Sequence, residues 1–427
     1  MKKKMALFIA VLLTLVAMAG CQERGSNGSP VLADTLAVPG AIKESVFYED
    51  VSEDFRSSLW TFAGKTSGSV LKDEAGQNTL YSPISLYYAL AMLEAGAAGQ
   101  TKEDLRGFLD AADQTKIGEE LRNLYALMTV DDEGAAEQIA NAFWARMDLV
   151  GKEGAGVKEA WLNQMADNFY ASAFAVDFAD PKTADRMSRW VEEQTRGKIK
   201  PDIDVSDPSL LMVLMNTVYF KADWLEPFQE EAIKEDLFYG VEEVLEQVSY
   251  LRGSFDSHST LVTDRFTAGQ LPLMNGYMRF ILPAEDLTPE DLLADPLFLA
   301  SLQSQGWQRT DLVIELPKFS YRTKMDILKD MEDLGLTAMV QGSPDFSAML
   351  DLDAEVSAIS QETYIALDEK GVEAAGYTEI MMRDSGALVP DQIQRVVLIL
   401  NRPFLYLITD EAGTPLFVGI LRNPSGE

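Results

Sequence analysis

The stretch from Asp368 to Pro390, DEKGVEAAGYTEIMMRDSGALVP, decides how the fold of this chain is understood. It opens with charged residues and Gly371, continues with small side chains, and then mixes bulky apolar residues with polar ones. The stretch is too apolar for a flexible linker and too rich in glycine and alanine for an ordinary core strand. The composition alone therefore leaves open whether this segment is an exposed loop or a strand.

The stretch divides into two sets of side chains, because alternate residues of a β-strand point to opposite faces. The first set is small or apolar and carries no charge: Val372, Ala374, Gly376, Thr378, Ile380 and Met382. The second set carries every charge as far as Arg383: Glu373, Ala375, Tyr377, Glu379, Met381 and Arg383. One face can enter a core while the other meets solvent or covering helices. The alternative is an ordinary amphipathic strand, which Gly376 and the neighbouring alanines disfavour.

The composition excludes several classes of function. The 427 residues include 36 Lys and Arg against 68 Asp and Glu, a formal net charge of −32, which argues against a nucleic-acid partner. The single cysteine excludes an internal disulfide, and no cluster of Cys and His suggests a zinc site. The single histidine, His258, lies in a polar, loop-like context in SFDSHST, which argues against a Ser-His-Asp triad. We therefore expect no enzyme activity, no cofactor and no metal.

The N-terminus, MKKKMALFIAVLLTLVAMAGC, indicates export. A lysine-rich start and an apolar run too short to span a bilayer comfortably predict a signal peptide over residues 1–20. Its end resembles a bacterial lipobox, which predicts lipidation of Cys21; a plain signal peptide with an incidental cysteine is the alternative. Residues 21–44 are predicted to be a flexible tether, with ordered structure beginning near Ser45. We expect a protein secreted across the inner membrane and lipid-anchored at a cell-envelope surface, or an extracellular one, with no other membrane contact.

The rest of the chain is predicted to be α+β, with helices clustered early and strands dominating late. A buried helix is expected to begin near Pro83 and to end at Gly96. The near-continuous apolar run over residues 209–228 predicts a central strand that is buried on both faces. Residues 395–424 predict two long strands that are joined by a turn containing glycine.

Five ordered motifs of this chain resemble those of the serpins, the family of serine protease inhibitors. They are NTLYSPISLYYALAMLEAGAAGQT (78–101), NTVYFKADWLEPF (216–228), ELPKFSYRTKMDILKDMEDLGLTAMV with PDFSAM (315–349), LDEKGVEAAGYT (367–378) and NRPFLYLITDEAGTPLFVGILRNP (401–424). The resemblance implies one domain over residues 45–427, with three β-sheets and about nine helices. It also implies an exposed reactive-centre loop at about residues 371–395.

The resemblance also assigns roles to individual residues. The implied hinge of the loop consists of Glu369, Gly371, Val372, Glu373, Ala374, Ala375 and Gly376. The implied network under the opening strands consists of Ser85, Asn216 and Gln361, with Trp224 at the point where the loop first enters the sheet. Family spacing places the reactive bond at Ser385-Gly386, with Met382, Arg383 and Asp384 as alternative residues before the bond.

The function implied by the resemblance is irreversible inhibition of serine-type or cysteine-type endopeptidases. A protease cleaves the loop, the loop inserts into the central sheet, and the covalently attached protease is distorted. The expected partners are target endopeptidases in a covalent complex with a monomeric inhibitor. The alternative is a non-inhibitory serpin that acts as a binding or chaperone-like module.

Overall fold

The computed structural model describes residues 34–425, apart from residues 38, 43–45, 73–75, 112, 151–155, 242–243, 338, 340–341 and 374–393. The chain divides into two compact units, Met1–Leu32 and Ala33–Glu427. All the described residues belong to the second unit, and the fold below is the fold of that unit.

Most of the helices come early in the chain, as the sequence predicts. The described helices are α1 (Glu53–Val70), α2 (Pro83–Gly96), α3 (Gly99–Leu109), α4 (Ile117–Leu127), α5 (Glu159–Phe169), α6 (Lys182–Gln194), α7 (Pro289–Leu293), α8 (Phe298–Ser304) and α9 (Leu328–Asp333). Local chemistry sets their starts: the side chain of Ser52 accepts a hydrogen bond from the amide of Phe55 at the start of α1. Pro83 occupies the first turn of α2, where its missing N–H costs nothing.

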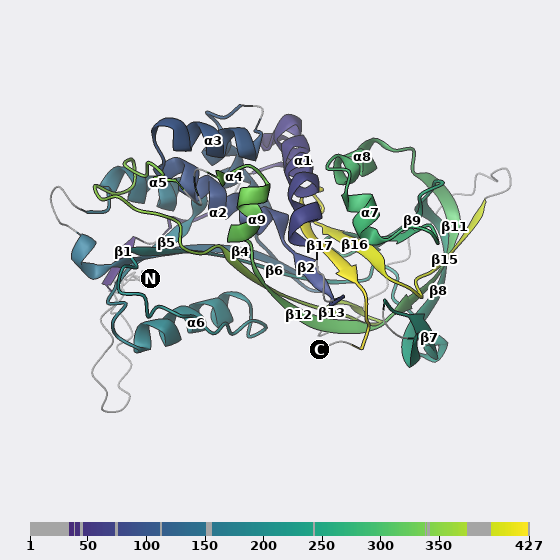
Figure 1. The fold of residues 1–427 in the computed structure, drawn as a ribbon. Coiled ribbons are helices and arrows are strands. Elements are labelled where there is room, and N and C mark those ends of the chain that lie inside the picture. Colours follow the sequence, from purple (N-terminus) through teal and green to yellow (C-terminus); the bar gives the residue numbers. More distant parts are fainter. Residues whose placement is uncertain are drawn as a thin grey trace, which may run out of the picture. The chain divides into compact units, whose positions relative to one another are not determined.

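The first sheet carries the stretch that opened the sequence analysis. Its strand order is β1 (Asp34–Ala37), β5 (Ala171–Val176), β4 (Ala135–Arg146), β6 (Met212–Asp223), β14 (Gly371–Val372), β13 (Ser360–Leu367) and β12 (Phe319–Asp326), with β3 (Val130–Asp132) paired to β4. Helices α2 to α5 lie on one side of this sheet and α6 lies on the other (Figure 1).

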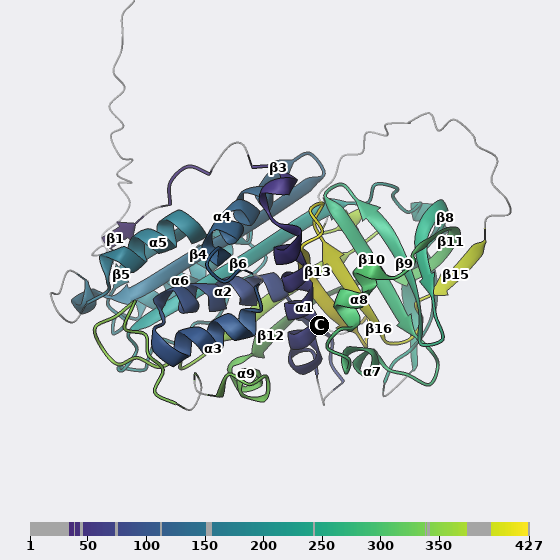
Figure 2. The same cartoon turned by 90° about the horizontal axis from the view of Figure 1, so that it is seen from above.

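The second sheet gathers the late strands. Its order is β15 (Arg395–Ile399), β11 (Gln308–Pro317), β8 (Val244–Val262), β9 (Phe266–Leu273), β10 (Gly276–Pro283), β16 (Phe404–Thr409), β17 (Pro415–Leu421) and β2 (Thr79–Tyr81), with β7 (Lys234–Tyr239) paired to β8. Figure 2 shows β8 to β11 and β15 side by side. The 19-residue β8 pairs in turn with β7, β11 and β9, so the described strands form two sheets, whereas the resemblance implies three.

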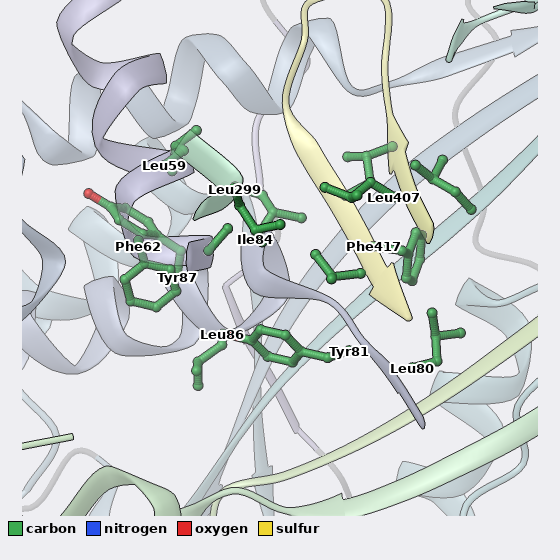
Figure 3. Close-up of a cluster of buried hydrophobic side chains, with 14 of the residues drawn as sticks. Leu59, Phe62, Leu80, Tyr81, Ile84, Leu86, Tyr87, Leu299, Leu407 and Phe417 are labelled. Carbon is green, nitrogen blue, oxygen red and sulfur yellow. The ribbon is translucent and has the colours of Figure 1, made fainter. Parts of the chain in front are cut away.

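The hydrophobic core lies where α1 and α2 pack against the last two strands. Figure 3 shows side chains of α1, β2, α2, α8, β16 and β17 meeting in this cluster. Tyr87 of α2 packs edge-on against Phe55 and Phe62 of α1, with ring centroids 5.7 and 5.0 Å apart. These aromatic contacts hold α1 and α2 together.

Three expectations from the sequence are corrected. Ordered structure begins before Ser45, because Asp34–Ala37 of the expected tether pairs with the edge strand β5 as β1. His258 does not lie in a loop: it is a buried residue of β8. The side chains over most of β6 are half-buried rather than buried on both faces. Over most of its length β6 pairs only with β4 in the described part of the chain.

Candidate functional site

The candidate site is the gap between strands β6 and β13 of the first sheet. Among the described residues, these two strands are joined only through the two residues of β14. Val372 pairs with Ala222 of β6 and with Leu367 of β13, and Gly371 pairs with Asp223. Beyond this bridge β6 pairs only with β4 in the described part of the chain, which explains why its side chains are half-buried.

A tight hairpin brings β14 into the gap. The chain leaves β13 at Leu367, and the carboxylate of Asp368 accepts hydrogen bonds from the amides of Lys370 and Gly371 at 2.8 and 3.2 Å. The amide of Asp368 in turn donates to the carbonyl of Gly371 at 3.0 Å. An aspartate that binds amides two and three residues further on is a typical start of a reversing turn. The local sequence therefore directs the chain back along β13.

Trp224 fastens this hairpin at the end of β6, as the resemblance implies. Its indole N–H donates to the carbonyl of Asp368 at 2.9 Å, and its amide donates to the carbonyl of Lys370 at 2.8 Å. The amide of Phe228 donates to the carbonyl of Glu369 at 3.0 Å. The segment after β6 thus satisfies backbone carbonyls across the hairpin and fixes the hinge at the top of the gap.

Glu369 forms a close ion pair with Lys318, whose Nζ lies 2.6 Å from its carboxylate. The hydrogen bond from Lys318 is the main reason that the pKa of Glu369 lies below its usual range. Lys318 lies between β11 and β12, so the pair ties the hairpin to the far side of β13. Lys318 belongs to the LPKF motif, but its role was not identified from the sequence.

Val372 and Glu373 point to opposite faces, as the alternation predicts. Val372 is 3% exposed and belongs to the hydrophobic core. Below it lies a cavity of about 30 Å³ whose walls include Val218 and Phe220 of β6 and Thr363 and Ile365 of β13. A cavity of this size has room for a small side chain. The gap between the strands is therefore open just beyond the last described residue of the loop.

Glu373 lies on the other face, beneath the segment that connects α6 to β6. Its carboxylate lies 2.8 Å from Nζ of Lys198 and accepts a hydrogen bond from the hydroxyl of Tyr219 at 3.3 Å. Burial, with the nearby Glu373 carboxylate as a second cause, raises the pKa of Tyr219 to about 12, so this hydroxyl keeps its proton. Neither Lys198 nor Tyr219 was singled out from the sequence, because nothing local links either residue to the loop.

The hydrogen bonds of Gln361, Asn216 and Ser85 differ from those that the resemblance implies. The side-chain amide of Gln361 accepts a bond from the amide of Ser82 at 2.7 Å and donates to the carbonyl of Ser82 at 3.0 Å. Asn216 donates to Asn141 of β4 at 2.6 Å. Ser85 contributes its backbone amide, 3.4 Å from the hydroxyl of Ser82. Gln361 is therefore held by the start of α2, and the predicted side-chain partnership of Gln361 with Ser85 and Asn216 is wrong for the described residues.

Several predicted site residues lie outside the described residues. They are Cys21, the hinge residues Ala374, Ala375 and Gly376, and the reactive-bond residues Met382, Arg383, Asp384, Ser385 and Gly386. The structure thus places the hinge from Glu369 to Glu373 and the strands that flank the gap.

His258 and Asp351 carry no catalytic arrangement in the described part of the chain. Nε2 of His258 lies 3.6 Å from the carboxylate of Glu226, and its Nδ1 faces the carbonyl of Asp256 at 3.1 Å. Asp351, in the acidic stretch DLDAE, forms an ion pair with Lys158 at 3.0 Å. Both residues therefore have structural partners.

Comparison with known proteins identifies the family. The family model described as serpin (serine protease inhibitor) matches residues 57–424. Serine proteinase inhibitor 2 of rabbitpox virus is 27% identical over 359 residues, covering 82% of this chain and 96% of the viral protein. Alpha-1-antiproteinase of the rat is 25% identical over 413 residues, covering 92% of this chain and 96% of the rat protein.

The fold is shared with solved structures. The thermophilic serpin tengpin in its native state superposes with a TM-score of 0.77 at 24% identity, over 92% of this chain and 100% of tengpin. The expected α+β serpin fold is thereby confirmed. Because the family model spans nearly the whole second unit, this chain belongs to the serpin family of serine protease inhibitors.

Proposed function

We propose that this protein inhibits serine-type or cysteine-type endopeptidases irreversibly, by offering its loop as a substrate and inserting the cleaved loop into the first sheet. The observation that supports this most directly is β14. The first two residues of the loop already pair with both strands that flank the gap, before any cleavage. Insertion therefore extends an existing strand rather than starting a new one.

The proposed chemistry begins in the target protease. Its nucleophile, a serine oxygen or a cysteine sulfur, attacks the carbonyl carbon of the loop residue before the reactive bond. An ester or thioester forms, the peptide bond breaks, and the new amino group takes the proton. The C-terminal piece of the inhibitor stays attached through β15, β16 and β17, which pair with other strands of the second sheet. The freed arm can then move into the gap with the protease attached.

The sequence of the arm matches the gap that receives it. The next residue on the face of Val372 is Ala374, followed by Gly376 and Thr378, all small. The cavity beside Val372 has room for one small side chain, and its walls include both apolar residues, such as Val218 and Ile365, and polar ones, such as Thr363. In an inserted arm, the residues on the face of Glu373 would continue as Ala375, Tyr377 and Glu379, toward the side of the first sheet on which α6 lies. Both faces of the arm therefore suit their surroundings.

Insertion supplies the free energy that distorts the protease. An inserted arm of about fifteen residues spans on the order of 50 Å and satisfies backbone groups along two open strand edges. The uncleaved fold is then metastable, and slow conversion rather than equilibrium keeps it active. Release of stored strain by loop insertion in serpins is a general example of this kind of switch.

We further propose that the inhibitor acts at a cell-envelope surface, held by a lipid on Cys21. The support is the sequence AMAGC after a lysine-rich apolar leader. None of the described helices is long and apolar enough to cross a membrane. The target proteases would then be enzymes that reach that surface.

The proposal is tested by mixing the purified protein with a panel of serine and cysteine endopeptidases. A covalent complex that survives boiling in denaturant is the expected result for at least one protease. The cleaved inhibitor should also unfold at a higher temperature than the uncleaved one, because the sheet has gained a strand. If every protease in the panel is either indifferent to the protein or cuts it without complex formation, the inhibitory proposal is wrong and a non-inhibitory role is favoured.

A further inference from the structure

Glu373 is a buried carboxylate at the point where the loop leaves the described sheet. It is only 8% exposed although it points away from the core. Its amide donates to the carbonyl of Ala366 at 2.7 Å, one residue beyond the end of β14, and its own backbone has a positive φ of 50°. A buried carboxylate needs a partner, and the groups that face it are Lys198 and Tyr219.

The segment that carries Lys198 is firmly held. Thr195 is almost fully buried, and its hydroxyl donates to the carbonyl of Val191 at 2.7 Å and accepts from the amide of Ile199 at 3.1 Å. The amide of Gly197 donates to the carbonyl of Glu192 at 2.7 Å. Lys198 therefore projects from a closed turn at the end of α6, and its position over the gap does not depend on the loop.

Lys198 also connects the two sides of the gap. Its own segment leads into β6, whereas its Nζ lies 5.4 Å from the centre of the Tyr364 ring on β13. Arg196, two residues earlier, lies over the ring of Tyr219 at 5.1 Å and pairs with Asp131 of β3 at 2.9 Å. The positive charge of Lys198 is thus placed where the loop passes between the two strands.

We propose that Lys198 is a positioning residue that holds Glu373, and with it the first loop residues, in the sheet before cleavage. This inference rests on the proposed function and adds a determinant of the speed of insertion. Without Lys198 the Glu373 carboxylate would be buried with only one weak donor. Leaving the sheet for water then becomes favourable, since an unpaired buried charge is costly. After cleavage, the arm would then have to begin insertion without its first residues already in the sheet.

The first test measures hydrogen exchange in the uncleaved protein, without any protease. We expect the backbone amides of residues 366–373 to exchange at least about tenfold faster in Lys198→Met than in the wild type, because their protection depends on local opening. Lys198→Arg should retain the slow exchange. The matched control is Lys200→Met, which removes a more exposed lysine that pairs with Glu192 at 3.2 Å in the same segment. Unchanged exchange in Lys198→Met would overturn the inference.

A double-mutant cycle shows whether the effect runs through Glu373. In Glu373→Gln the buried group is neutral, so adding Lys198→Met should cause little further increase in exchange. Additive effects of the two changes would contradict a direct pairing. Glu373→Gln also keeps the test decisive if Lys198→Met does not fold, because loss of the carboxylate should itself speed exchange at residues 366–373.

The second test uses a protease that the wild type traps. Lys198→Met should consume severalfold more inhibitor molecules per protease molecule inactivated, whereas Lys200→Met should match the wild type. Equal consumption by Lys198→Met and the wild type would contradict a role in insertion. If the wild type traps no protease, the proposed function fails, and the exchange experiment still decides whether Lys198 holds the hinge.

Discussion

A Cβ atom placed on Gly371 would lie 2.4 Å from the carbonyl oxygen of Ala222 in the neighbouring strand β6. It would also lie 2.6 Å from the α-carbon of Asp223. Both obstacles are backbone atoms of a paired strand, so neither can move without breaking the ladder. The glycine of the hinge is thus required by close approach of two backbones.

Gly371→Ala should therefore expel the start of the loop from the sheet. We expect faster hydrogen exchange at residues 366–373 in the uncleaved protein and a lower fraction of protease trapped after cleavage. Gly306→Ala is the matched control, because no atom lies within 4 Å of the Cβ position there. Wild-type exchange rates in Gly371→Ala would show that the strands can separate to admit a methyl group.

Val372→Arg should turn the inhibitor into a substrate. The side chain at 372 is buried, and a guanidinium there would enter a low-dielectric core without a partner, at a cost of several kcal/mol. Insertion then slows while the protease completes deacylation at its own rate, so cut inhibitor and active protease are released. Residual protease activity is measured against the ratio of inhibitor to protease.

The control for Val372→Arg is Val397→Arg, since Val397 of β15 is 55% exposed and should tolerate a charge. The cleaved wild type should also resist heat better than the uncleaved form. Efficient trapping by Val372→Arg, or identical melting of cleaved and uncleaved wild type, would count against the insertion mechanism.

The sequence could predict those features that depend on short-range patterns. Period-two alternation placed Val372 and Glu373 on opposite faces, with Val372 in the core, and the structure confirms this. Pro83 and Gly96 marked the ends of α2, and Gly413 lies at positive φ in the turn between β16 and β17. Each of these signals is carried by a few adjacent residues.

The remaining features depend on contacts between distant segments. Lys198 meets Glu373 only because the segment that follows α6 passes close to the start of the loop, and Gln361 bonds to the backbone of Ser82 rather than to the predicted side chains. The pairing of β1 with β5 was missed because the Gly, Ser and Pro content of the N-terminal segment resembles a linker, whereas an open sheet edge accepts any extended backbone. The sequence around His258 predicts a loop because its neighbours are polar, although the residue lies in the long strand β8.

The reactive bond remains a prediction from spacing, since residues 374–393 lie outside the described part of the chain. We expect cleavage within Met382–Gly386, with Ser385-Gly386 as the leading bond. Cleavage after Arg383 would indicate a trypsin-like target, and cleavage after Met382 a chymotrypsin-like or elastase-like one. Mass spectrometry of the released C-terminal peptide identifies the bond. A peptide that begins beyond Leu388 would refute this placement.

The lipid anchor is tested by metabolic labelling with a fatty-acid probe in a bacterial host. We expect the wild type to be labelled and to fractionate with membranes. Cys21→Ser should be unlabelled, because the thiol is the proposed site of attachment and the sequence contains no second cysteine. Equal labelling of both proteins, or none in either, would leave a plain signal peptide as the better description.

Two buried carboxylates give the last prediction, which concerns the dependence of stability on pH. Asp410, at the end of β16, is 3% exposed, and burial raises its pKa to about 6. Burial also raises the pKa of Glu137 of β4 well above its usual range, and the nearby Asp410 adds to that rise. The amide of Thr414 binds Asp410 at 2.7 Å, and the side-chain amide of Asn275 binds Glu137 at 2.7 Å. Arg56 lowers the pKa of Asp410 only in part.

A carboxyl group whose pKa is higher in the folded protein than in the unfolded chain stabilises the fold at low pH. Its contribution is complete below about pH 4, the unfolded pKa, and is lost as the pH rises through the folded pKa of about 6. A rise of about two pKa units corresponds to about 3 kcal/mol. Asp410→Asn keeps the acceptor for Thr414 but cannot ionise, so it should unfold at a higher temperature than the wild type at pH 7 and at a similar temperature at pH 4. The exposed Asp264→Asn is the control for net charge. Melting curves recorded at one scan rate between pH 4 and 7 test this, and a parallel decline in wild type and Asp410→Asn would show that Asp410 is not the group that titrates.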